Sequence, residues 1–96
     1  MSRTALVTGA GQGLGKEVVL RLGRRGYAVH VTDIDGALAA RTAAETGADA
    51  WGSTLDVRDA DACRAAAQQT VARTGSLDLW VNNAGDRKST RLNSSH

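Results

Sequence analysis

Short apolar runs alternate along this chain with longer segments in which apolar or small residues recur at helical spacing. Four runs are mostly apolar, as parallel strands covered on both faces usually are: residues 3–7, 27–33, 50–55 and 77–81. The intervening segments predict helices over about 13–25, 35–46 and 60–74. This alternation predicts an α/β fold, a Rossmann-like doubly wound parallel sheet that is truncated after its fourth strand and has the strand order 3-2-1-4.

Each predicted helix has one face of small or apolar residues. In the first helix, Leu14, Val18 and Leu22 follow one another at the four-residue spacing of a helix face. The third helix has two candidate N-terminal caps, Asp59 and Asp61. The inward positions predicted for the second and third helices are Leu38, Ala39, Thr42 and Ala43, and Cys63, Ala66 or Ala67, Thr70 and Val71.

A glycine-rich segment, here called the glycine turn (Thr8–Gly15), joins the first run to the first helix. The N–H groups and dipole of a helix N-terminus favour an anion such as a pyrophosphate, and glycine allows its close approach. The common G-x-G-x-x-G fingerprint does not fit, because Leu14 and Lys16 occupy the positions of its third glycine. An ordinary glycine-rich turn is the alternative. The pattern that does fit is T-G-x-x-x-G-x-G, at Thr8, Gly9, Gly13 and Gly15.

With this spacing the chain resembles the short-chain dehydrogenase/reductase family. A second signature of that family, Asn-Asn-Ala-Gly, follows the fourth run at residues 82–85. The resemblance covers residues 1–85 and implies the NAD(P)-binding Rossmann half of an oxidoreductase. It implies that the glycine turn, including Gln12 and Leu14, contacts the cofactor.

Asp33 ends the second run twenty residues after Gly13, where a Rossmann unit places the acid that accepts hydrogen bonds from the adenosine ribose. Its carboxylate would repel a 2′-phosphate, Ile34 rather than a basic residue follows it, and Gln12 in the glycine turn is also uncharged. These features favour NAD over NADP. The alternative is that Asp33 only caps the next helix, although Asp35 is equally able to do so.

Further cofactor contacts are implied by the family resemblance alone. Asp56, after the third run, corresponds to the residue that contacts the adenine edge, and Val57 to the residue that covers the ring. In the second signature, the implied contacts lie on the nicotinamide side of the cofactor, at Asn83, Ala84 and Gly85.

Composition limits the other classes of function. The net charge of +2 comes from residues 86–96, so residues 1–85 are balanced and give no support to nucleic-acid or membrane binding. Cys63 is the only cysteine, which excludes an internal disulfide and fits a reducing cytoplasm. His30 has no ligand-spaced neighbour and is predicted to be a packing or surface residue, and Trp80 is predicted to fill a sheet–helix interface. No metal site is predicted.

The last eleven residues, 86–96, differ from the rest of the chain. They contain one apolar residue and no period, which predicts disorder. They also resemble the translation of a common sequencing adapter, so we interpret them as a non-native tail after a natural segment, 1–85. A natural basic tail is the alternative.

The expected parent protein is a cytoplasmic, homo-oligomeric enzyme that transfers a hydride between NAD(H) and a small alcohol or carbonyl substrate. The family's catalytic Ser and Tyr-x-x-x-Lys are not found: the only tyrosine is Tyr27, and Val31 stands four residues after it. No catalytic residue is therefore predicted, and the chain itself is expected to be inactive. The alternatives are a non-catalytic dinucleotide sensor and a truncated product without function.

Overall fold

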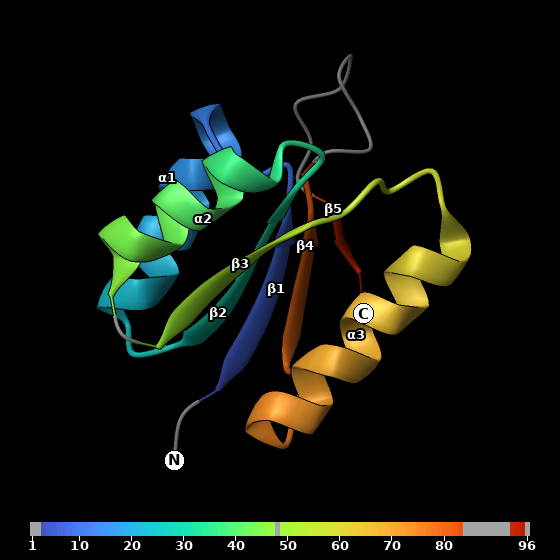
Figure 1. Cartoon of the computed structure of the whole chain (residues 1–96). Helices are drawn as coiled ribbons and strands as arrows, with labels where there is room; N and C mark the ends of the chain where they lie inside the picture. Colours follow the sequence, from blue (N-terminus) through green and yellow to red (C-terminus); the bar gives the residue numbers. More distant parts are fainter. Residues whose placement is uncertain (1–2, 48, 84–92, 96) are drawn as a thin grey trace.

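The structure is a computed structural model that describes residues 3–47, 49–83 and 93–95. Its elements alternate as the apolar pattern predicts (Figure 1). In chain order they are β1 (Thr4–Thr8), α1 (Gly13–Arg24), β2 (Ala28–Asp33), α2 (Gly36–Thr46), β3 (Ala50–Thr54), α3 (Ala60–Thr74), β4 (Leu79–Asn82) and β5 (Asn93–Ser95).

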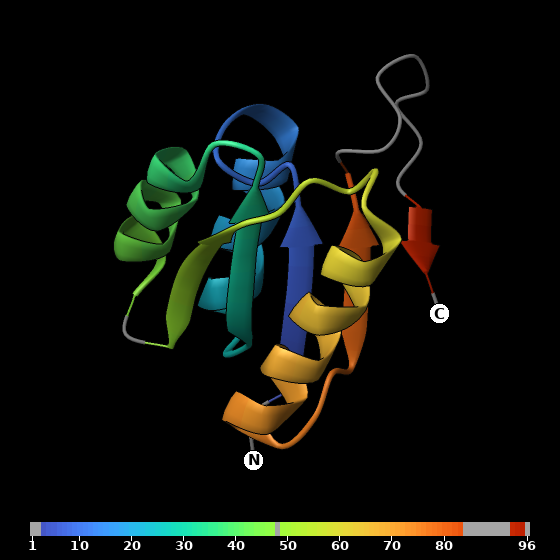
Figure 2. The ribbon, with the colours of Figure 1, turned by 45° about the vertical axis from the view of Figure 1, so that its right-hand side comes forward.

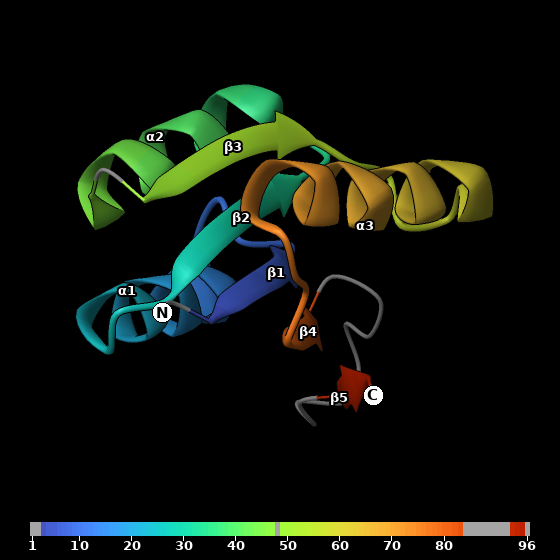
Figure 3. The same ribbon diagram turned by 90° about the horizontal axis from the view of Figure 1, so that it is seen from below.

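The strands form one sheet with the order β3-β2-β1-β4-β5 (Figure 2). The first four strands are parallel, which confirms the predicted Rossmann-like order 3-2-1-4. Helices α1 and α2 lie on one face of the sheet and α3 lies on the other (Figure 3). Because the strands are parallel, all their carboxyl ends meet at one edge, where ligands bind in this class of sheet.

Two rows of side chains run across the four parallel strands, one on each face of the sheet. One row, here called the valine row, packs on the side of α1 and α2 with Val19, Ala39 and Ala43. The other, here called the aromatic row, packs on the side of α3 with Ala66. The pairing of the strands gives the valine row as Gly52, Val31, Val7 and Val81, and the aromatic row as Trp51, His30, Leu6 and Trp80.

The predicted packing roles of two of these residues are confirmed. His30 is fully buried, and its ring stacks on Trp51 with centroids 4.8 Å apart. Trp80 packs between the sheet and α3, against the cluster that contains Leu6 and Leu55. Neither side chain marks a ligand site at the carboxyl edge.

Some predicted helix positions need correction. Leu14 is 52% exposed and Val71 is 44% exposed, so neither belongs to the buried stripe of its helix. Each lies one position away from the true stripe, whose buried members are Gly15 and Val19 in α1, and Ala66 and Thr70 in α3. The cap of α3 is Asp59, whose carboxylate accepts from the N–H of Ala62 at 3.0 Å.

Within residues 86–96, for which the sequence predicts disorder, the structure describes Asn93–Ser95. These residues form β5, which pairs antiparallel with β4. The physical reason is that an edge strand offers unpaired N–H and C=O groups to any extended segment that can reach it. The remaining tail residues, 86–92 and 96, lie outside the described residues.

Candidate dinucleotide site

The glycine turn lies at the carboxyl edge of the sheet and leads directly into α1. Gly9 and Gly13 have φ angles of 61° and 64°, which side-chain-bearing residues rarely adopt. A Cβ on Gly13 would meet no atom within 4 Å, so the space beside the start of α1 is open. The first N–H groups of a helix have no partner within the helix. The turn therefore presents donors to an accessible space, as an anion site requires.

Gly15 has a different role, in the first turn of α1. A Cβ there would overlap the carbonyl oxygen of Gly9 and lie 2.8 Å from Nδ2 of Asn83. The same Asn83 side chain donates a hydrogen bond to that Gly9 carbonyl at 3.2 Å. Gly15 thus allows α1 to pack directly on the glycine turn and on the end of β4.

Asp33, at the end of β2, is held beside the glycine turn. One carboxylate oxygen accepts from the N–H of Gly11 at 2.9 Å, and the other accepts from the N–H of Asp35 at 2.9 Å. The cap of α2 is Asp35, which accepts from the N–H groups of Ala37 and Leu38. Asp33 is therefore not the cap of α2, and its carboxylate lies against the glycine turn.

The end of β4 is joined to the glycine turn by both asparagines of the second signature. The Thr8 hydroxyl donates to Oδ1 of Asn82 at 3.0 Å, while Asn83 donates to Gly9. These contacts bridge residues 74 positions apart in the chain. The two signatures thus meet at the edge of the sheet. Ala84 and Gly85 lie outside the described residues.

The loop after β3 approaches the same edge. The N–H of Leu55 donates to the carbonyl of Asp33 at 2.9 Å, which places Asp56 and Val57 shortly beyond the end of β2. Arg58 holds both carboxylate oxygens of Asp56 through its side chain, at 3.0 and 2.9 Å. Hydrogen bonds from Arg58 lower the pKa of Asp56 from 3.8 to about 2, so the carboxylate is ionised at neutral pH.

Two exposed apolar side chains lie in or beside the glycine turn. Leu14 is the second residue of α1 and faces solvent. Ile34, which is 63% exposed, follows Asp33 directly. Gln12 is also exposed and makes no side-chain cap for α1.

Sequence reasoning missed several contacts around the turn. Thr42 on α2 donates from its buried hydroxyl to the carbonyl of Gly11 at 3.1 Å, and the N–H of Ala10 donates to the carbonyl of Thr32 at 2.9 Å. A signal for Thr42 was present, because a hydroxyl on a predicted buried face must find a partner. No sequence signal indicated the pairing of Arg58 with Asp56 or of Ala10 with Thr32.

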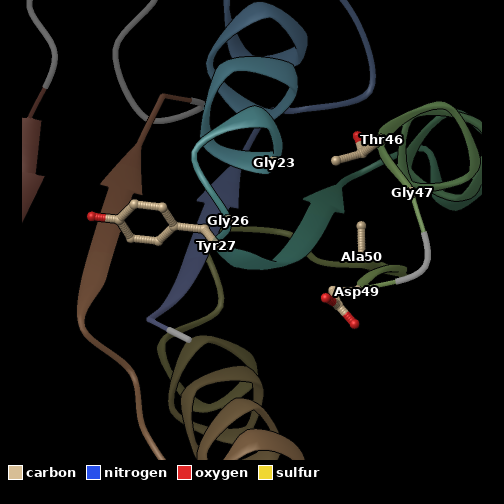
Figure 4. Close-up of a pocket in the computed structure, with 7 residues that line it drawn as sticks. All are labelled: Gly23, Gly26, Tyr27, Thr46, Gly47, Asp49 and Ala50. Carbon is tan, nitrogen blue, oxygen red and sulfur yellow. The ribbon is translucent and has the colours of Figure 1, made fainter. Parts of the chain in front are cut away.

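A cavity of about 170 Å³ lies at the opposite edge of the sheet, where α1 and α2 end (Figure 4). It is bounded by Gly23, Thr46 and Ala50, and the Tyr27 ring points away from Thr46 (Figure 4). It includes none of the predicted site residues.

Within residues 3–47, 49–83 and 93–95, no group of three or more His, Cys, Asp or Glu side chains is placed to hold a metal. In the same part of the chain, every helix is too short or too polar to cross a bilayer.

Comparison with known sequences gives a consistent result. The family model described as short chain dehydrogenase matches residues 3–95. A probable oxidoreductase, EphD, of Mycobacterium tuberculosis (strain ATCC 25618 / H37Rv) is 45% identical over 82 residues, which are 82% of this chain and 14% of the relative. The 3-oxoacyl-[acyl-carrier-protein] reductase FabG of Staphylococcus aureus (strain N315) is 38% identical over 89 residues, 88% of this chain and 36% of the relative.

Solved structures give the same picture. A hydroxysteroid dehydrogenase from Escherichia coli superposes with a TM-score of 0.82 at 32% identity, covering 88% of this chain and 37% of that one. A 3-ketoacyl-(acyl-carrier-protein) reductase from Brucella melitensis, complexed with NADH, superposes with a TM-score of 0.77 at 32% identity. The match covers 81% of this chain and 32% of the reductase chain. The chain therefore spans well under half the length of these proteins.

Proposed function

The chain belongs to the short-chain dehydrogenase family, and on that premise we propose that it is the NAD-binding part of an oxidoreductase. The whole protein would transfer a hydride between NAD(H) and a small alcohol or carbonyl substrate. The observation on which the proposal rests is the glycine turn, which is held in place from β2, the end of β4 and α2 while the start of α1 remains open. A dinucleotide pyrophosphate fits such a helix N-terminus.

We assign the adenosine ribose to Asp33. Its carboxylate already accepts from the N–H of Gly11, so it lies within reach of a ligand bound at the turn. A 2′-phosphate would place like charges side by side, which costs several kcal/mol when water is excluded. Ile34 and Gln12 offer that phosphate no positive charge. This arrangement favours NAD over NADP.

The other contacts are assigned by position along the same edge. The start of the turn and α1 (Thr8, Gly9, Gly13, Leu14 and Gly15) would hold the pyrophosphate, with Gln12 at its side. Asp56 and Val57 would lie against the adenine, and Asn83 with Ala84 and Gly85 would lie on the nicotinamide side. When bound, the nicotinamide supplies or accepts the hydride.

We place the groups that move the proton and orient the substrate outside this chain. Tyr27, the only tyrosine, precedes β2 at the edge of the sheet opposite the glycine turn. It lies beside the cavity at the ends of α1 and α2 rather than near Asp33 or Asn83. The 96-residue chain is therefore expected to bind NAD without oxidising alcohols or reducing carbonyl compounds. Homo-oligomer formation is proposed for the whole protein only.

Binding can be tested on the 96-residue chain by nuclear magnetic resonance, with amide shifts followed during addition of NAD and then NADP. We expect NAD to shift the amides of residues 11–15 and 33 at lower concentration than NADP. A well-dispersed spectrum that does not respond to either nucleotide would reject the proposal and favour a product without function. Tighter binding of NADP would reject the cofactor assignment alone.

The role of Asp33 has its own test. Asp33→Ser removes the charge and is expected to improve NADP binding relative to NAD by about tenfold, because a like-charge contact is relieved. Asp33→Asn keeps an acceptor for the N–H of Gly11 and serves as the matched control. Equal gains in both variants would assign the preference to charge, whereas an unchanged ratio in both would contradict the assignment.

A further inference from the structure

We propose that Thr42 on α2 is a positioning residue of the glycine turn, whose hydroxyl holds Gly11 in the conformation that receives the pyrophosphate. The ligand in this proposal is a dinucleotide, and in that respect the proposal rests on the function proposed above. Its structural part, the ordering of the turn by Thr42, can be tested without any nucleotide.

The two polar backbone atoms of Gly11 are held by different elements. Its N–H donates to Asp33 at the end of β2, and its carbonyl accepts from the Thr42 hydroxyl at 3.1 Å. Thr42 has no exposed surface, and Gly11 is buried. A buried carbonyl without a partner is costly, so the Thr42 hydroxyl fixes the orientation of this peptide group.

Contact between α2 and the turn is also close. A Cβ on Gly11 would lie 2.5 Å from Cβ of Leu38, which is one helical turn before Thr42. The turn therefore packs against α2 by its backbone, and this close approach is possible because Gly11 has no side chain. Thr42 supplies the hydrogen bond at this contact.

The Thr42 hydroxyl behaves differently from the other threonine hydroxyls in the described helices. Thr46, Thr70 and Thr74 each donate to the carbonyl four residues earlier in their own helix, at 2.7, 2.8 and 3.0 Å. That local bond is common for a helical threonine. Thr42 instead donates to a residue 31 positions away. Its hydroxyl thus connects α2 to the turn, which a local bond cannot do.

This connection affects ligand binding through preorganisation. The neighbouring groups are also held, since the carbonyl of Gly9 accepts from Asn83 and the N–H of Ala10 donates to Thr32. Gly11 lies one residue before Gln12, the N-cap of α1, and is the residue of the turn whose carbonyl is held by α2. If its carbonyl is released, the turn must be ordered when the ligand binds, and the ordering free energy is lost from the affinity.

The test compares three variants of the 96-residue chain. Thr42→Val removes the hydroxyl and keeps the shape, Thr42→Ser keeps the hydroxyl, and Thr46→Val removes a hydroxyl that bonds only within α2. Without nucleotide, amide hydrogen exchange at Gly11 should rise at least about fivefold relative to the core of β1 in Thr42→Val, as expected for one lost hydrogen bond. Thr42→Ser and Thr46→Val should leave this ratio unchanged. NAD affinity should fall by a similar factor in Thr42→Val only.

The outcomes separate the two proposals. If amide exchange at Gly11 responds as expected but neither the original chain nor any variant binds NAD, the positioning role stands and the dinucleotide function is rejected. If NAD binds and Thr42→Val changes neither Gly11 exchange nor affinity beyond Thr46→Val, the positioning role is rejected. Should Thr42→Val fail to fold, Thr42→Ala replaces it. The ratio of amide exchange at Gly11 to exchange in the core of β1 should then rise in Thr42→Ala and stay unchanged in Thr42→Ser.

Discussion

The two faces of the sheet use the same four parallel strands but differ in the size of their side chains. On the side of α1 and α2, the valine row contains three valines and Gly52. On the opposite face, the side of α3, the aromatic row contains two tryptophans, a histidine and Leu6. Helices α1 and α2 cover the first face, and α3 lies on the second (Figure 3).

This difference relates packing to the site. Small residues on the valine side let backbones approach one another: a Cβ on Gly52 would lie 2.7 Å from the backbone of Ala39 in α2. The same closeness brings α2 within reach of the glycine turn through Thr42. The aromatic side instead fills its space with rings and buried hydrogen bonds, as between His30 and the hydroxyls of Thr70 and Ser53. Precision at the turn is therefore expected to depend on the valine side.

The largest effect is expected from filling the close approach between β3 and α2. Gly52→Ala places a methyl group against the backbone of Ala39, which cannot move as a flexible side chain can. We expect a loss of roughly 3 kcal/mol in the free energy of unfolding, at the upper end of overpacking penalties. Urea unfolding followed by circular dichroism measures it. A loss below about 1 kcal/mol, the lower end of those penalties, would contradict the tight packing of this face.

The aromatic side is expected to be sensitive to acid. His30 is buried, with Nδ1 2.8 Å from the Thr70 hydroxyl and Nε2 2.6 Å from the Ser53 hydroxyl. Because Thr70 donates to the carbonyl of Ala66, we infer that it accepts from Nδ1–H and that Ser53 donates to Nε2. The imidazole is thus satisfied in its neutral form. Burial, and then the charge of Arg73, lower the pKa of His30 from 6.5 to about 4.

The sign of the pH dependence follows from this pKa. Between about pH 6.5 and pH 4 the unfolded chain binds the proton and the folded chain does not, so stability falls as the pH falls. The loss amounts to roughly 2 to 3 kcal/mol over this window. His30→Gln, which does not titrate, should remove the dependence between these pH values. Parallel pH profiles for both proteins would show that His30 is not its source.

The smallest effect is expected at the outer layer of the aromatic side. The guanidinium of Arg73 lies 4.4 Å from the centre of the Trp51 ring, which stacks on His30. Arg73→Gln should lower stability by only about 0.5 kcal/mol, as for an exposed cation–π contact. It should also raise the pKa of His30, because a nearby positive charge is removed. Titration of the His30 ring by nuclear magnetic resonance checks this direction, and a lower pKa would contradict it.

Much of the fold could be predicted because its signals are local. Runs such as residues 50–55, and stop signals such as Gly75, place the elements within one or two residues of their observed bounds. The errors lie where a helix face had to be chosen among small residues, since alanine-rich helices have a weak period. Val71 was placed inward for this reason and is exposed. The pairing of β5 was not predictable, because it depends on the open edge of β4.

The sequence by itself determined the order of the elements, the glycine pattern and the position of Asp33 at a strand end, since each is a matter of spacing along the chain. Only the tertiary structure decided which groups hold the turn. Thr42 and Asn83 reach it from 31 and 74 residues away. Such contacts depend on how closely helices and strands pack, and the packing distance is set by the small residues on both sides of each contact rather than by any local pattern.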